Sequence, residues 1–187
     1  MTAMGDGDGG AGQGSETAIV AGGCFWGVEE IFRQIPGVSD TMVGYIGGQL
    51  ANPTYKDVCR GDTGHAEAIR ITFDPKRTSY EQILDTFFRL HDPTTLNRQH
   101  NDIGTQYRSA IYVFNAEQRA AAERSKQVYG QALKAKGHGA ITTEIVEGPP
   151  FYFAEDYHQQ YLAKNPRGYC GIGGTGVSCP VGFFVPA

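Results

Sequence analysis

The sequence predicts an α+β fold in which helices pack on a largely antiparallel sheet. The first observation is the order of its segments, which is strand, helix, strand, strand, helix, strand, helix, strand. The second is that this order lacks the regular strand–helix alternation of a doubly wound parallel sheet. The third is the length of 187 residues, which suits one domain with a short appendage.

The N-terminal half contains a tail, two strands and a helix. Residues 1–16 hold six glycines and no Lys or Arg, which predicts a disordered tail. The apolar run 18–21 ends at Gly22-Gly23 and predicts a buried strand. A helix is predicted next by apolar residues at i, i+3, i+4 and i+7, namely Val28, Ile31, Phe32 and Ile35. Pro36-Gly37 ends that helix, and residues 38–46 are β-prone.

The C-terminal half continues in the same manner. Strands are predicted for residues 65–73, 107–114 and 142–146. One helix is predicted to begin at Thr78 or Ser79, and another, capped by Asn115, ends near Gly137. We therefore expect a folded α+β domain over residues 17–164.

Residues 165–187 form a separate region by composition. The stretch is rich in glycine, and we expect a flexible arm rather than a packed element.

Charge and hydropathy exclude several classes of function. Of the net charge of −4, residues 1–16 carry −3, so the remainder is near neutral. A pI of about 5.7 argues against nucleic acid as the main partner. Apolar runs fall short of the roughly 18 to 20 residues that a membrane span needs. Because no signal-peptide pattern is present either, we expect a cytoplasmic protein.

Four cysteines, at positions 24, 59, 170 and 179, are too few for a disulfide scaffold in a chain of this length. In a reducing compartment, a cysteine cluster is more often catalytic, redox-active or metal-binding than structural. Cys59 has no partner by spacing, and we expect it to be a bystander.

Cys24 lies in Gly23-Cys24-Phe25-Trp26-Gly27, between the first predicted strand and helix. A helix N-terminus favours a thiolate by about 0.3–1 kcal/mol through its dipole and free backbone N–H groups. Phe25 and Trp26 offer an apolar wall beside the sulfur. The pattern indicates a nucleophile, with a buried structural cysteine among core aromatics as the alternative.

Glu67 is the second candidate. Counting back by two from Ile69, Ile71 and Phe73 places Glu67 on the apolar face of its strand. A carboxyl that loses solvation has a raised pKa and suits a general acid near neutral pH. A strand-end glutamate that reaches solvent or a salt bridge is an equally supported alternative.

The glycine-rich arm carries Cys170 and Cys179. Its backbone freedom lets the two thiols reach a distant sulfur and each other, as thiol–disulfide exchange requires. A structural disulfide is the alternative.

Two motif matches lack the context that gives them a mechanism. Gly171-x-Gly173-x-x-Gly176 matches a dinucleotide fingerprint, but no strand precedes it. His65-Ala66-Glu67 begins like a zinc-deaminase signature, yet no Pro-Cys-x-x-Cys follows. The other histidines and the cysteines lack metal-ligand spacing, so we expect no metal site.

Four motifs occur in order along the chain: Gly23-Cys24-Phe25-Trp26-Gly27, Gly61-Asp62-Thr63-Gly64-His65-Ala66-Glu67, His91-Asp92-Pro93-Thr94-Thr95 and Gly168-Tyr169-Cys170-Gly171. Together they resemble the A-type peptide methionine sulfoxide reductases, an enzyme class that restores oxidised methionine. The likeness extends from about Thr17 to Cys179. It implies a two-layer α/β sandwich related to the split βαβ (ferredoxin-like) plait, and residues 17–164 as the catalytic domain.

The resemblance also implies roles for individual residues. Cys24 attacks the sulfoxide sulfur, and protonated Glu67 donates a proton to the sulfoxide oxygen. Tyr55 and Tyr107 hydrogen-bond that oxygen, with Asp102 beside the site. Phe25 and Trp26 hold the substrate methyl group in an apolar pocket. His158 and Tyr161 lie in a stretch that matches the family, without an assigned role.

A relay of thiols follows from the same resemblance. Cys24 becomes a sulfenic acid, Cys170 condenses with it, and exchange with Cys179 moves the disulfide to the arm. Thioredoxin then reduces the Cys170–Cys179 disulfide, with no nicotinamide, flavin or metal cofactor. The implied substrate is the S epimer of methionine sulfoxide, free or in proteins, and we expect a monomer.

Two other interpretations stay open at this point. One is a zinc-dependent hydrolase or deaminase that uses His65 and Glu67. The other is a non-catalytic module that binds peptides through Phe25, Trp26 and the tyrosines.

Overall fold

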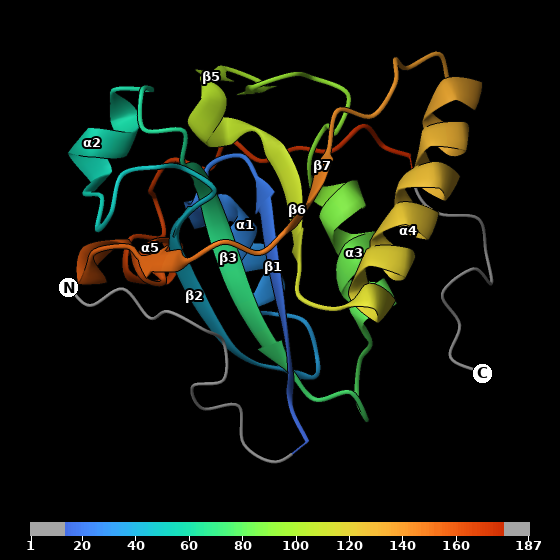
Figure 1. Cartoon of the computed structure of the whole chain (residues 1–187), viewed down its shortest axis with the longest axis horizontal. Coiled ribbons are helices and arrows are strands. Elements are labelled where there is room, and N and C mark those ends of the chain that lie inside the picture. Colours follow the sequence, from blue (N-terminus) through green and yellow to red (C-terminus); the bar gives the residue numbers. More distant parts are fainter. Residues whose placement is uncertain (1–13, 178–187) are drawn as a thin grey trace.

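A six-stranded mixed sheet forms the centre of the molecule (Figure 1). The computed structural model describes residues 14–177. The strands of this sheet are β1 (Glu16–Gly22), β2 (Val38–Ile46), β3 (Ala66–Phe73), β6 (Ser109–Val113), β7 (Glu144–Glu147) and β8 (Phe151–Phe153). Their order is β7-β6-β1-β3-β2-β8, and every pair is antiparallel except β6 with β7. The prediction of an α+β fold with a largely antiparallel sheet is confirmed.

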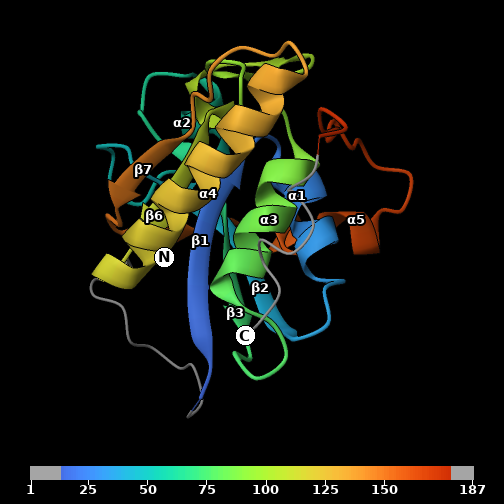
Figure 2. The same ribbon diagram turned by 90° about the vertical axis from the view of Figure 1, so that its right-hand side faces the viewer.

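Helices α1 (Phe25–Phe32), α3 (Tyr80–Leu90) and α4 (Ala116–Ala135) pack on one face of the sheet (Figure 2). Their apolar residues meet the strand residues that point to that face, among them Val20, Val43, Ile69, Ile71 and Ile111. Two of these helices begin at side-chain caps that satisfy free backbone N–H groups. Ser79 accepts from the N–H of Gln82, and Asn115 accepts from the N–H of Gln118. The second and third helices predicted from sequence are therefore confirmed.

The opposite face of the sheet carries a smaller cluster, in which four of the seven residues are alanines: Ile19, Ala21, Ile46, Ala66, Ala68, Ala110 and Tyr112. The segment between β7 and β8 crosses in front of this face in Figure 1, and Phe151 packs against the cluster. Small side chains allow this close approach of a single chain segment. The sheet is thus covered by helices on one face and by the segment between β7 and β8 on the other.

A glycine turn joins β1 directly to α1. Gly23 has a φ of +105°, a left-handed conformation that side chains rarely adopt, and a Cβ there would lie 2.8 Å from Cγ of Gln99. The helix therefore begins immediately after the strand, with Cys24 as its N-cap residue. It ends at Phe32, and Ile35 packs on the core from the turn before Pro36.

Several short elements were not predicted. They are β8, α2 (Tyr55–Cys59), β4 (Arg98–Gln99), β5 (Asp102–Ile103), α5 (Tyr161–Lys164) and two 3-10 turns at Thr105–Tyr107 and Asp156–His158. Tyr107, expected in a strand, lies in the first of these turns because its N–H bonds to the carbonyl of Gly104 before β6 begins.

The glycine-rich stretch after α5 differs in part from expectation. It has no strand up to Val177, as its composition predicts. Yet Ile172 packs against the main core cluster, and the carbonyl of Gly173 lies 2.8 Å from Nε2 of His100. This part of the arm is therefore held against the domain. Cys179 lies outside the described residues. No helix among residues 14–177 is long and apolar enough to cross a bilayer.

Candidate active site

The thiol of Cys24 is buried at the start of α1, with 7% of the residue exposed. Burial raises the pKa of the Cys24 thiol to about 12, and the carboxyls of Glu67 and Asp102 add to the rise. The backbone N–H groups of Trp26 and Gly27 donate to the sulfur and lower the pKa by less. The expected effect of the helix N-terminus is thus present but outweighed, and the resting group is a thiol.

Glu67 points from β3 toward the helices and is 2% exposed. Its Oε1 accepts the backbone N–H of Phe25 at 3.2 Å. Burial raises the pKa of Glu67 to about 8, the hydrogen bond from Phe25 lowers it, and the Asp102 carboxylate raises it further. The carboxyl therefore holds a proton at neutral pH, as its position on the apolar face predicts. The alternative of a solvent-exposed glutamate is wrong.

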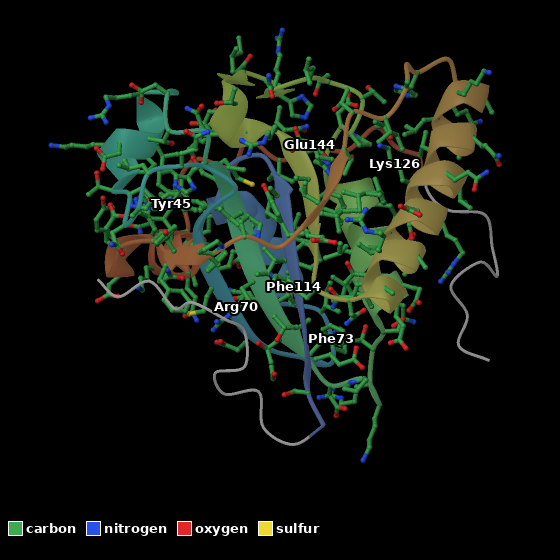
Figure 3. The ribbon with its side chains drawn as sticks, in the orientation of Figure 1. Tyr45, Arg70, Phe73, Phe114, Lys126 and Glu144 are labelled. Carbon is green, nitrogen blue, oxygen red and sulfur yellow. The ribbon has the colours of Figure 1, made fainter. Side chains whose placement is uncertain are left out.

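Tyr45, labelled in Figure 3, pairs with Glu67 in the register of β2 and β3. Its hydroxyl donates to Oε1 of Glu155, and the other oxygen of Glu155 accepts the N–H of Tyr55. Glu155 thus holds the start of α2 against β2, beside Glu67. Neither Tyr45 nor Glu155 was predicted from sequence.

An aromatic cluster lies beside the first turn of α1. The ring of Trp26 stacks on that of Tyr161, with centroids 3.9 Å apart and planes 14° apart. The indole N–H of Trp26 donates to Nδ1 of His158 at 3.0 Å. The His158 ring in turn lies 4.4 Å from that of Tyr55 and 5.3 Å from that of Phe25. His158 and Tyr161, which had no assigned role, therefore complete an apolar wall.

Buried polar contacts fix this cluster to the domain. Glu29 of α1, 1% exposed, accepts hydrogen bonds from the hydroxyl of Thr41 and the N–H of Gln160. The amide of Gln159 bonds both the N–H and the carbonyl of Val43. The segment that carries His158 and Tyr161 is thus held by α1 and β2. Sequence reasoning had no signal for Glu29, which occurs on an otherwise apolar helix face.

Tyr55 occupies the first position of α2, and its hydroxyl donates to the thiol of Cys59. Burial raises the pKa of Tyr55, and this hydrogen bond and the nearby Glu67 carboxyl raise it further. The hydroxyl is therefore a protonated donor close to Glu67. Cys59, expected to be a bystander, contacts a predicted site residue.

Tyr107 and Asp102 also lie close to Glu67. Burial raises the pKa of Tyr107, and the carboxyls of Glu67 and Asp102 raise it further. The hydroxyl of Tyr169 donates to Oδ1 of Asp102 at 3.3 Å, whereas Oδ2 is buried without a partner among residues 14–177. Tyr107 and Asp102 therefore interact electrostatically with both Cys24 and Glu67.

Cys170 lies against the helix turn that holds Cys24. A Cβ on Gly27 would be 3.0 Å from Sγ of Cys170, and the N–H of Gly27 donates to Sγ of Cys24. The thiols of Cys24 and Cys170 therefore both lie next to Gly27. Of the predicted site residues, only Cys179 is not placed, because it lies outside the described residues.

The imidazole of His65 hydrogen-bonds to the backbone of the loop after β2. Nδ1 accepts the N–H of Gly48 at 3.0 Å, so Nε2 carries the proton and donates to the carbonyl of Leu50 at 2.7 Å. With both nitrogens bonded to backbone, His65 has no lone pair for a metal, which removes the basis of the zinc interpretation. Among residues 14–177, no three His, Cys, Asp or Glu side chains are grouped to hold a metal ion.

The site combines a buried thiol, a buried carboxyl that holds a proton near neutral pH, and a second thiol that lies against the same helix turn. Together with the α+β fold, these features define a thiol-based oxidoreductase.

Comparison with known proteins identifies the particular family. The family model described as peptide methionine sulfoxide reductase matches residues 16–176. Peptide methionine sulfoxide reductase MsrA 1 of Caulobacter vibrioides is 62% identical over 173 residues, which cover 92% of this chain and 80% of that protein. The chain belongs to the peptide methionine sulfoxide reductase family, and it reduces the S epimer of methionine sulfoxide.

Solved structures agree with this assignment. Methionine sulfoxide reductase A of Corynebacterium diphtheriae has a TM-score of 0.81 and 41% identity, covering 94% of this chain and 85% of that chain. The reduced form of Mxr1 from Saccharomyces cerevisiae has a TM-score of 0.77 and 37% identity, covering 83% and 88%. Mxr1 has also been solved in complex with Trx2.

Proposed function

We propose that Cys24 is the nucleophile and Glu67 the general acid of this reduction. The observation that carries the proposal is the hydrogen bond from the N–H of Phe25 to Glu67, which ties the acid to the residue next to Cys24. A protonated carboxyl buried in a site of low dielectric is a suitable donor to the sulfoxide oxygen. Tyr107, whose raised pKa keeps its hydroxyl protonated, supplies a further hydrogen bond to that oxygen. Tyr55 supplies another when its single O–H turns from Cys59 to the substrate.

The reaction transfers one oxygen atom between two sulfur atoms. Glu67 gives its proton to the sulfoxide oxygen, which makes the substrate sulfur electrophilic. The Cys24 sulfur attacks it as the thiol proton returns to Glu67, so the acid is regenerated. The hydroxyl group then moves from the substrate sulfur to the Cys24 sulfur as the substrate S–O bond and the transient sulfur–sulfur bond break. Methionine leaves with two electrons more than the sulfoxide, and Cys24 becomes a sulfenic acid.

Substrate orientation is assigned to the aromatic cluster. Phe25 and Trp26 form the wall that receives the substrate methyl group, with Tyr161 stacked behind the indole. Asp102, with one buried oxygen free of protein partners among residues 14–177, lies beside the bound substrate.

The second half of the cycle restores the thiols. The Cys170 sulfur attacks the Cys24 sulfenic acid, the S–O bond breaks, and the oxygen leaves as water with the thiol proton. Exchange with Cys179 moves the disulfide to the arm, where thioredoxin reduces it. The exposure of Cys170 and the complex of the yeast relative Mxr1 with Trx2 support this relay.

We also infer that the central strands form a split βαβ (ferredoxin-like) plait. The chain order β1-α1-β2-β3-α3-β6 and the sheet order β6-β1-β3-β2 support this inference. In the same proposal, residues 1–16 are a tail, 17–164 the catalytic domain and 165–187 a glycine-rich arm, although Glu16 belongs to β1 and so corrects the first boundary by one residue. In the same proposal, the enzyme acts as a monomer. The proposed relay needs reduced thiols at the start of each cycle, so the proposal places the enzyme in a reducing, cytoplasmic compartment.

Replacing Cys24 tests the proposal most simply. The reduced Cys24→Ser variant, mixed with the S epimer and no added reductant, should form no methionine. Cys59→Ser, a change at another thiol near the site, is the matched control and should still complete one turnover. Methionine formed by Cys24→Ser at the wild-type rate would refute the assignment of the nucleophile.

A further inference from the structure

Two glycines flank Cys24 on one side of the α1 N-terminus. Gly23 lies outside the helix with a φ of +105°, and Gly27 lies in the first turn of α1, yet Ile172 is within 4 Å of the Cβ position of both. Because neither has a side chain, the backbone between them is open to close contact. We call this opening the glycine notch.

The side chain of Ile172 fills the glycine notch. A Cβ on Gly27 would lie 2.4 Å from Cγ1 of Ile172 and 3.2 Å from its Cβ, and a Cβ on Gly23 would lie 3.9 Å from Cδ1. Cβ contacts under 3.0 Å do not occur without displacement. Ile172 in this position therefore requires glycine at position 27.

Cys170 lies beside Ile172 in the same contact. Sγ of Cys170 is 3.0 Å from the Cβ position of Gly27, which Cγ1 and Cβ of Ile172 also approach. The N–H of Gly27 donates to Sγ of Cys24, so Gly27 contacts both thiols. The position of Ile172 on Gly27 therefore determines where Cys170 lies relative to Cys24.

Other contacts of the arm involve polar side chains or the backbone. Tyr169 donates to Asp102, and Nε2 of His100 bonds the carbonyl of Gly173. Gly174 passes the carbonyl of Arg89 so closely that a Cβ would lie 2.0 Å from it. The arm can be followed in red in Figure 2. Between Tyr169 and Val177, Ile172 is the one large aliphatic side chain.

We propose that Ile172 is a positioning residue for the second step of the reaction. By filling the glycine notch it holds Cys170 against the first turn of α1, and so sets the rate at which Cys170 traps the Cys24 sulfenic acid. The inference rests on the proposed thiol relay and assigns Ile172 no part in methionine formation.

The test separates the two steps in full-length enzyme. Reduced protein is mixed with the S epimer without reductant, methionine is quantified, and sulfenic acid is trapped with dimedone over time while remaining thiols are counted. Ile172→Ala should form methionine as wild type does but convert sulfenic acid to disulfide at least about tenfold more slowly. Ile172→Val should restore most of the rate, and Val177→Ala, which shortens another aliphatic side chain of the arm, is the matched control.

A paired substitution tests the contact itself. Gly27→Ala inserts the methyl group that collides with Cγ1 of Ile172, so disulfide formation should slow, although alanine is the better helix former. Combining it with Ile172→Ala removes the colliding atom, and the double variant should form disulfide faster than Gly27→Ala alone. This non-additive rescue is expected only if the two residues contact each other.

Two outcomes distinguish this inference from the relay. If Ile172→Ala forms disulfide at the wild-type rate while Cys170→Ser accumulates sulfenic acid, the relay stands and Ile172 has no positioning role. If Cys170→Ser also loses its sulfenic acid at the wild-type rate, the relay itself is wrong. Equal disulfide rates in the double variant and Gly27→Ala would likewise overturn the notch contact.

Discussion

Trp26 donates its indole N–H to Nδ1 of His158 across 132 positions of sequence, at 3.0 Å. Because Nδ1 is an acceptor, the ring is neutral and its proton is on Nε2. Burial lowers the pKa of His158, which keeps this neutral form in place near pH 7. The orientation of the proposed methyl-binding wall therefore depends on a histidine that no local pattern marks.

Removal of that acceptor should weaken substrate binding. His158→Leu leaves the indole N–H without its partner, and we expect KM for methionine S-sulfoxide to rise about tenfold, equivalent to the loss of about one hydrogen bond. His158→Asn places an oxygen near the Nδ1 position and should retain most of the affinity. Trp26 is the single tryptophan, so its fluorescence reports the indole environment directly. Equal KM values and unchanged emission in His158→Leu would contradict the contact's role.

Glu67→Gln should abolish most of the first step without disturbing the fold. The amide oxygen can still accept the N–H of Phe25, but the side chain no longer transfers a proton. General acid catalysis contributes about 10²–10⁴-fold, and the single-turnover rate of methionine formation should fall by that factor. Thermal unfolding provides the control for stability. An unchanged rate would show that the proton comes from another group.

The pH dependence of the first step distinguishes Glu67 from Cys24 as the limiting group. Burial raises the pKa of Glu67 to about 8, so its acid form persists below that pH and is lost above it. The rate should be level near pH 6–7 and fall about tenfold per unit above pH 8. A rate limited by the Cys24 thiolate, with a pKa of about 12, would instead rise with pH. Rapid-quench measurement from pH 6 to 10 decides between them.

His91 should make the fold less stable in acid. It is fully buried, with Nδ1 bonded to the carbonyl of Phe87 and Nε2 to the hydroxyl of Ser109. Burial lowers the pKa of His91 from 6.5 to about 4. Between these values the unfolded chain binds the proton and the folded one does not, so stability decreases as pH falls, by about 3 kcal/mol in total.

Urea unfolding at pH 7 and pH 5 measures this effect. The wild type should lose about 2 kcal/mol between the two conditions from His91. His91→Gln, which cannot titrate, should lose correspondingly less, whatever its stability at pH 7. The same loss in both proteins would assign the acid sensitivity to other groups.

Local sequence patterns were sufficient to predict the positions of Cys24 and Glu67, the centre of the site. The two-residue period of β3 placed Glu67 on the buried face, and the glycine turn placed Cys24 at a helix start. Both are consequences of neighbouring residues, which sequence periodicity captures. The family motifs then added Tyr55, Tyr107 and Asp102, which no periodicity indicated.

Contacts between distant segments could not be predicted. Glu29 bonds Gln160 across 131 positions, and nothing in the pattern of α1 marks a buried acid there. The sequence also did not predict that the pKa of Cys24 is raised, for a similar reason. Its helix position favours the thiolate, but the opposing burial depends on packing between segments far apart in the sequence.

The central claim is that the enzyme reduces the S epimer with electrons from its own thiols. Its most direct test is to incubate fully reduced enzyme with each sulfoxide epimer, without added reductant, and to measure methionine and remaining thiols. The account predicts methionine from the S epimer alone. The first turnover consumes two thiols as a disulfide, and exchange with Cys179 frees Cys24 for a second turnover, so about two methionines per chain should form. No methionine from either epimer, with all four thiols intact, would contradict it.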